Sequence, residues 1–276
     1  MNGFVVYALP MVIAYAVTVK WIVDRWWMPD SYYSHGPLVP IVAVVVLWTR
    51  RVEWSSLAAR HDLRGWWLLG PGLLMHLCGA ALMIDSLSAA SLVLSLVGVV
   101  WLGMGPARLG QIWPVLLLVF LAIPLPIFMT GRIAFELKEV AIQLSEYACA
   151  MIGLDVTRVA ADLYVSPHPQ PLKVADACSG LRSLMALTTL GYCVAFFMGS
   201  QKGARRWILL LSAVPIAVLT NVFRITGICW SAREYGVQFA GTTGHDTLGW
   251  AAWVVAMAML LALDWLVSPR RRKRSA

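Results

Sequence analysis

Three residues that lie far apart in the sequence have side chains that together could carry out acyl transfer. Cys178 lies in "ADACSGLR", Arg224 in "TNVFRITG" and His245 in "TTGHDTLGW". A cysteine thiolate is a nucleophile that forms thioesters, and a histidine moves protons near neutral pH. An arginine stabilises an acyl oxyanion through charge-assisted hydrogen bonds. The fold would have to bring these three side chains to one place.

The composition indicates that a membrane protein must position them. Of the 276 residues, 60% are hydrophobic and only 13% are charged, which is too apolar for an ordinary soluble domain. The formal charge of +8 comes from basic residues clustered in short gaps between apolar runs. Such clusters are typical of cytoplasmic membrane anchors and not of a nucleic-acid-binding surface. We predict an all-α integral membrane protein with one membrane-embedded domain, 1–276, and no nucleic-acid partner.

Apolar runs of about 20 residues predict about eight transmembrane helices. They are expected at 4–23, 37–49, 65–85, 87–105, 112–129, 179–199, 207–229 and 248–267. One set of gaps, together with the C-terminal tail, holds thirteen Lys and Arg residues, and the opposite set holds six. The positive-inside rule therefore predicts that both termini are cytoplasmic. The polar stretches 24–36, 130–177 and 231–247 are then on the outer face of the cytoplasmic (inner) membrane.

The longest outer stretch leads to Cys178. Residues 131–154 have apolar positions at helical spacing with charged residues between them, which predicts an amphipathic helix lying in the membrane interface. Residues 155–177 contain β-branched residues, prolines and turn formers. We interpret this segment as a short strand pair or an ordered loop before the cysteine.

Helical geometry places the polar residues at one depth. Cys178 opens the sixth span, and Arg182 follows one turn later on the same face. Asn221 and Arg224 share a face of the seventh span, with Arg224 about 26 Å along the axis from the start of that helix and near the outer surface. His245 directly precedes the eighth span on the outer side. Three independent placements therefore predict one site at the outer face.

Taken singly, each residue has a simpler explanation. Cys178 could be a small packing residue, Arg224 could reach the interface along its aliphatic stem, and His245 could be structural. The sequence has five cysteines and no CxxC spacing, so it indicates no zinc site, and nothing in it indicates an organic cofactor. We interpret the remaining cysteines as packing residues and His76 as a satisfied interior histidine; these cysteines are Cys78, Cys149, Cys193 and Cys229.

At these residues the chain resembles the exosortase/archaeosortase family of multispan cysteine transpeptidases. The resemblance covers most of the chain, and its motifs occur in order: "DSYYSHGPLVP" (30–40), "IPLPIFMTGRIAFELKEVAIQLS" (123–145), "VADACSGLRSL" (174–184), "NVFRI" (221–225) and "GHDTLGW" (244–250).

The resemblance implies a role for each residue. Cys178 would be the nucleophile, Arg224 the oxyanion-stabilising residue and His245 the general acid/base. Supporting residues around the site would be Ser179, Gly180, Arg182 and Asn221. An outer loop would contribute Asp30, Tyr33 and His35, with no role assigned.

The resemblance also implies the substrate class. The enzyme would act on exported proteins with a C-terminal sorting signal, made of a motif such as Pro-Glu-Pro, an apolar helix and a basic end. Membrane lipids would surround that helix. The acyl group would pass to an acceptor at the outer surface, which the sequence leaves open between water, a lipid amine and a glycan.

Other functions remain open at the level of sequence. A rhomboid-like serine hydrolase would use Ser179 as nucleophile and His245 as base. A transporter or lipid flippase would use Arg182 and Arg224 to bind an anionic head group. An inactive scaffold for exopolysaccharide assembly is a further alternative.

Overall fold

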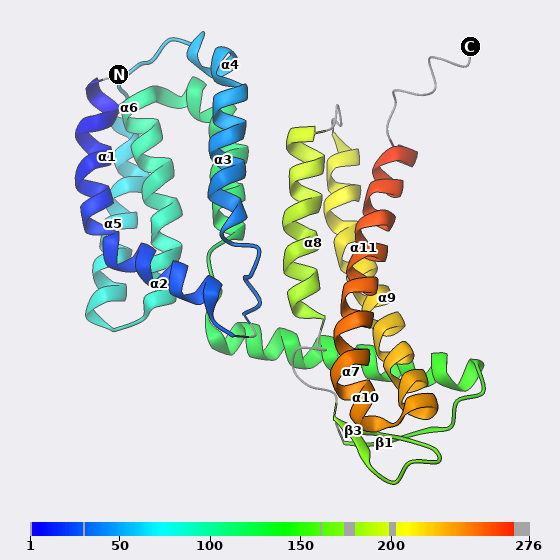
Figure 1. Cartoon of the computed structure of the whole chain (residues 1–276). Helices are drawn as coiled ribbons and strands as arrows, with labels where there is room; N and C mark the ends of the chain where they lie inside the picture. Colours follow the sequence, from blue (N-terminus) through cyan, green and yellow to red (C-terminus); the bar gives the residue numbers. More distant parts are fainter. Residues whose placement is uncertain (1, 30, 161, 174–179, 199–202, 268–276) are drawn as a thin grey trace, which may run out of the picture. The chain divides into compact units, whose positions relative to one another are not determined.

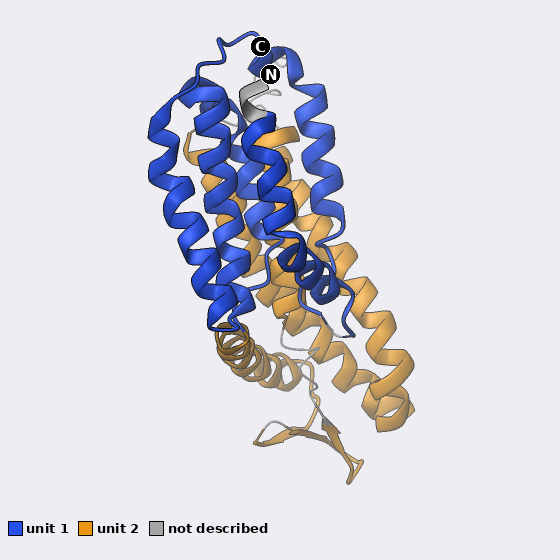
Figure 2. Cartoon of the chain, turned by 90° about the vertical axis from the view of Figure 1, so that its left-hand side faces the viewer, with its two compact units in different colours: residues 1–126 blue, residues 127–276 orange. Residues whose placement is uncertain are grey.

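The chain folds mostly into helices. The computed structural model describes residues 2–29, 31–160, 162–173, 180–198 and 203–267, and these include one three-stranded sheet. The chain divides into two compact units, Met1–Pro126 and Ile127–Ala276 (Figure 2). The single domain over 1–276 stays a prediction.

Among the described residues, every regular element of the first unit is a helix. Its elements, in chain order, are α1 (Asn2–Ala14), α2 (Ala16–Trp27), α3 (Leu38–Thr49), α4 (Arg51–Ser55), η1 (Leu63–Gly65), α5 (Trp66–Ala81) and α6 (Asp85–Leu121) (Figure 1).

The first predicted span, 4–23, is broken at Tyr15. Helices α1 and α2 meet there with a bend of 61°. The Tyr15 ring is buried, and its hydroxyl is 2.9 Å from the Ser91 hydroxyl and 2.8 Å from the Ser95 hydroxyl of α6. At this break the Tyr15 side chain points toward α6 and joins the two apolar segments by hydrogen bonds.

A second set of hydroxyls joins α2, α5 and α6. The Ser88 hydroxyl is 2.7 Å from the Thr18 hydroxyl and 2.7 Å from Nδ1 of His76. The His76 ring also stacks on Tyr15, with ring centroids 4.1 Å apart. The prediction that His76 is a satisfied interior histidine is confirmed.

Helix α6 consists of two limbs. Gly105 has φ 82° and ψ 170°, a conformation open to glycine, and Pro106 follows it. Val100 of the first limb and Ile112 of the second belong to one buried cluster, and Figure 1 shows the chain reversing direction at the kink. The limbs correspond to the predicted spans 87–105 and 112–129. The second limb ends at Leu121, shortly before the prolines of "IPLP".

The second unit contains the sheet and the remaining helices. Its elements, in chain order, are α7 (Ile127–Met151), β1 (Val156–Val159), β2 (Asp162–Val165), β3 (Pro171–Lys173), α8 (Leu181–Cys193), η3 (Val194–Met198), α9 (Ala204–Tyr235), α10 (Val237–Phe239), η4 (Ala240–Gly244) and α11 (His245–Val267). Helix α7 lies crosswise to α8, α9 and α11 (Figure 1).

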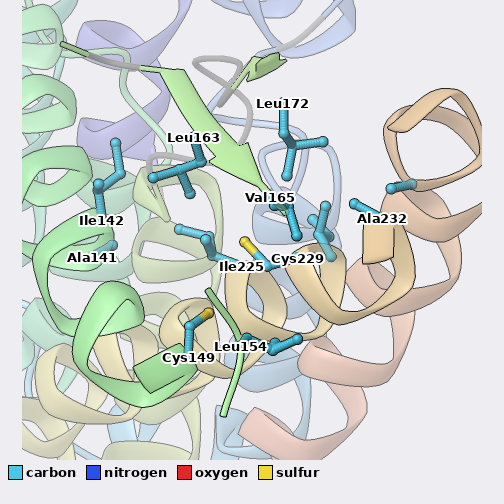
Figure 3. Packing of buried hydrophobic residues seen from close by; sticks show 12 residues of the cluster. Ala141, Ile142, Cys149, Leu154, Leu163, Val165, Leu172, Ile225, Cys229 and Ala232 are labelled. Carbon is cyan, nitrogen blue, oxygen red and sulfur yellow. The ribbon is translucent and has the colours of Figure 1, made fainter. Parts of the chain in front are cut away.

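The sheet packs against helices α7 and α9. Its strands are antiparallel in the order β1, β2, β3, with Leu163 opposite Leu172. Leu163 and Val165 are fully buried, and they pack in one cluster with Ile142 of α7 and Ile225 of α9 (Figure 3). The segment for which we predicted a strand pair or an ordered loop therefore has a regular meander that ends at Lys173.

Helix α7 buries one face on which most side chains are small. Ala134, Ala141 and Ile142 are buried, whereas the apolar Val140 and Leu144 are exposed. An ion pair ties the helix to β1, because Nη2 of Arg158 lies 2.7 and 2.6 Å from the two carboxylate oxygens of Glu139. The Glu139 carboxylate raises the pKa of Arg158, which is therefore always charged.

Helices occupy all eight predicted segments, although fewer have the length of a membrane span. Four described helices are long and apolar enough to cross a membrane, and the bent α1–α2 pair would make a fifth. Helices α3 and α5 have 12 and 16 residues. The number eight stays a prediction.

Candidate functional site

The nucleophile candidate precedes α8 in the chain. Helix α8 begins at Leu181, and its N-cap residue Gly180 is buried with φ 77° and ψ −5°. Asp30, Cys178 and Ser179 lie outside the described residues. Helix α8 therefore begins after Gly180, and our placement of Cys178 one turn before Arg182 stays a prediction.

Asn221 of α9 faces this N-terminus. Its side chain is 4% exposed, and a Cβ atom added to Gly180 would lie 3.0 Å from the Asn221 amide nitrogen. The positive φ and the close approach both favour glycine at position 180. Arg182 lies half-buried in the first turn of α8.

Arg224 and His245 are in direct contact. Nη2 of Arg224 lies 2.7 Å from Nε2 of His245. A guanidinium can only donate, so Nε2 accepts, and the ring proton of the neutral imidazole is on Nδ1 in this arrangement. Both side chains are half-buried, one from the middle of α9 and the other from the first residue of α11.

One face of α9 connects both contacts. Asn221 and Arg224 are three residues apart and so lie on adjacent turns of the same face. Asn221 contacts the start of α8, and Arg224 contacts the start of α11. The second unit therefore brings together Gly180, Asn221, Arg224 and His245. Of these residues, Gly180 follows Cys178 in the chain by two positions.

Tyr33 and His35 belong to the first unit. Tyr33 is 5% exposed, and its oxygen accepts a hydrogen bond of 2.9 Å from the Leu125 N–H. Burial raises the pKa of Tyr33, so its hydroxyl stays protonated. These contacts hold the loop before α3 against the chain that follows α6.

His35 lies two residues after Tyr33 in the same loop. Both ring nitrogens are buried, and neither has a hydrogen bond of ordinary geometry with the described residues. Burial lowers the pKa of His35 below its usual value of 6.5, and the Leu121 backbone offsets part of this effect. The ring is therefore neutral at pH 7.

Gly249 also contacts the Arg224 side chain, and sequence reasoning missed it. An added Cβ at Gly249 would lie 3.2 Å from Nη2 of Arg224. The signal in the sequence is its spacing of four from His245, which places both residues on one face of α11.

The arrangement can stabilise an anion and move a proton. Arg224 presents a fixed positive fork, and the neutral His245 ring can take up a proton. In the described part of the chain, no three His, Cys, Asp or Glu side chains gather as a metal site would require.

Comparison with known proteins supports the family resemblance that the sequence motifs indicated. A family model described as transmembrane exosortase matches residues 26–262, which includes all the described site residues. No curated protein and no solved structure matches the chain.

Proposed function

The chain belongs to the transmembrane exosortase family, and we propose that it is a cysteine transpeptidase that cleaves C-terminal sorting signals at the outer face of the inner membrane. Family membership makes it a membrane protein of the class that processes exported proteins bearing such signals. The observation that carries the catalytic proposal is the 2.7 Å contact of Arg224 with His245, on the face of α9 that also contacts Gly180.

In the proposed reaction His245 takes the proton of the Cys178 thiol. The thiolate attacks the scissile carbonyl carbon and forms a C–S bond, while Arg224 donates hydrogen bonds to the oxyanion. The C–N bond breaks as His245 gives its proton to the leaving amine, which leaves a thioester on Cys178. An acceptor then loses a proton to His245, attacks the thioester and frees the thiolate.

The contact between Arg224 and His245 suggests how these steps are coupled. In the structure the Nε2 lone pair accepts a hydrogen bond from Arg224. When Arg224 donates to the oxyanion instead, that lone pair becomes available to a proton. We expect Asn221 and Gly180 to hold the start of α8, and Ser179 and Arg182 to line the site.

The test is co-expression with an exported reporter that ends in Pro-Glu-Pro, an apolar helix and a basic tail. We expect the wild type and Cys193→Ala to remove the tail, and Cys178→Ala to leave the reporter intact. Cys193 is the matched control because it is a cysteine of α8, the helix that follows Cys178. Intact mass of the product identifies water, a lipid amine or a glycan as the acceptor.

The same assay separates the alternatives. Processing by Cys178→Ala together with loss of processing in Ser179→Ala would replace the proposal with a serine hydrolase. Absence of processing in every variant, together with lipid or anion transport that depends on Arg182 and Arg224, would replace it with a transporter.

Arg224→Lys tests the role of the guanidinium. Lysine keeps the charge but loses the planar fork, so we expect the rate of reporter cleavage to fall by about 100-fold or more. Arg206→Lys is the control, because Arg206 lies over the Phe196 ring, away from His245. Cleavage at the wild-type rate by Arg224→Lys would show that a point charge is sufficient and would contradict the oxyanion role.

A further inference from the structure

We infer that Gly249 is a positioning residue for Arg224, because its missing side chain leaves the space in which the guanidinium lies when it donates to His245. Gly249 is one turn after His245 on α11, so both residues face the same side chain of α9. The catalytic consequence rests on the proposed function, whereas the positioning itself does not.

The contact involves the donor atom itself. A Cβ at position 249 would lie 3.2 Å from Nη2, 3.4 Å from Cζ and 3.5 Å from Nε of Arg224. The nearest of these atoms, Nη2, is the one that donates to Nε2 of His245 at 2.7 Å. An alanine would therefore move the guanidinium by a few tenths of an ångström, which is enough to lengthen and misalign a short hydrogen bond.

Helices α9 and α11 pack closely beyond Arg224. One turn further along α9, an added Cβ at Gly227 would lie 3.0 Å from Leu248 of α11. Beyond it, an added Cβ at Gly244 would lie 3.0 Å from the Ser231 hydroxyl. Two close approaches thus show that the start of α11 packs tightly on α9. The atoms that an added side chain at Gly249 would meet first belong to the end of the Arg224 side chain, which can move more easily than a helix backbone.

The first measurement is the kinetics of reporter cleavage. We expect Gly249→Ala to lower kcat about tenfold and to leave KM unchanged, because a small misplacement of a catalytic group affects the transition state more than substrate binding. Gly131→Ala is the matched control, since position 131 is also helical and an added Cβ there has no neighbour within 4 Å. That variant should keep the wild-type kcat.

The second measurement needs no activity. Diethylpyrocarbonate acylates a free imidazole nitrogen, so the contact with Arg224 should protect His245 in native membranes. We expect Gly249→Ala to raise the acylation rate of His245 severalfold, measured by peptide mass spectrometry with the exposed His61 as internal reference. Gly131→Ala should show the wild-type rate.

The two measurements distinguish the possible failures. An unchanged acylation rate of His245 in Gly249→Ala would overturn the inference, even if kcat fell. If acylation is faster in Gly249→Ala but the wild type does not cleave the reporter, the positioning role is supported. Only the proposed transpeptidase function would then be contradicted.

A folding defect would also be informative. If Gly249→Ala does not fold, the double variant with Arg224→Lys should recover, because lysine has no guanidinium at the contact. Failure of both variants to fold would show that the added side chain meets something other than Arg224, and the inference would be wrong.

Discussion

At the scale of single residues, the site depends on which polar groups have partners. Arg224 donates a hydrogen bond to His245, and Asn221 is buried against Gly180. His35 is the contrasting case, because its two nitrogens are buried without a hydrogen bond of ordinary geometry in the described structure. A buried neutral imidazole of this kind makes stability depend on pH.

We predict that His35 destabilises the protein as the pH falls. Burial holds its pKa in the folded state below 6.5, so the unfolded chain binds the proton first. The full stability is present above pH 6.5 and is lost progressively below it. His35→Gln should therefore show a smaller decrease in melting temperature between pH 7 and pH 5 than the wild type.

The control for this prediction is His61→Gln, at an exposed histidine that contacts Tyr7. It should keep the wild-type dependence on pH. An equal decrease in the wild type and in His35→Gln would contradict the prediction.

At the scale of elements, hydroxyl groups join the helices of the first unit. Tyr15 is 1% exposed and links the break between α1 and α2 to two serines of α6. Hydrogen bonds between membrane helices contribute modestly, about 1 kcal/mol each. They also specify which helix faces meet, since an unpartnered hydroxyl is costly in an apolar bundle.

We predict that Tyr15→Phe lowers the free energy of unfolding by about 1–2 kcal/mol, because the buried Ser95 hydroxyl loses its hydrogen-bond partner and the Ser91 hydroxyl keeps only its bond to the Ser88 carbonyl. Thermal unfolding in detergent measures the change. Tyr7→Phe is the matched control, because it removes only an exposed hydrogen bond to His61. A larger effect at Tyr7 than at Tyr15 would show that the buried network contributes little.

Helix α7 has a buried face and an exposed apolar face. The buried face packs inside the second unit, and Val140, Leu144, Tyr147 and Met151 form an exposed apolar row at helical spacing. An exposed apolar row on a helix that lies crosswise to its neighbours fits a membrane interface.

We predict that Leu144→Glu reduces the amount of folded protein recovered from the membrane, because a charge would replace an apolar side chain in the interface. Gln143→Glu introduces the same charge on the neighbouring exposed position and should be tolerated. Fluorescence-detected size exclusion of tagged variants measures both. Equal recovery of Leu144→Glu and Gln143→Glu would indicate that the exposed apolar row faces water and not the membrane interface.

At the scale of the whole molecule, the distribution of charge predicts the topology. We propose that both termini are cytoplasmic and that the sheet and α7 are at the outer face. A reporter enzyme that is active only after export should therefore be active when fused after Gly153, between α7 and β1. The same reporter after Arg60, between α4 and η1, should be inactive. The reverse pattern would contradict the proposed orientation.

Much of the architecture follows from the sequence alone. Apolar runs and proline positions locate the helices, because a helix satisfies its own backbone in an apolar environment whatever it packs against. The reversal at Gly105 and Pro106 is likewise local, since a glycine with positive φ followed by a proline ends a helix. The residue types of the site were also identified from their motifs.

Other features required the tertiary structure. Helix α7 buries Ala141 and Ile142 against α9 and the sheet and leaves Val140 and Leu144 exposed, because the burial of each position depends on the elements that pack against the helix. The N-cap position of Gly180, with its positive φ, also required the tertiary structure, because Asn221 of α9 packs against it. The 2.7 Å contact of Arg224 with His245, and the space at Gly249 that permits it, depend on how α9 and α11 pack. A sequence determines periodicity along one helix, whereas the distance between two helices is set by side chains distant in the chain.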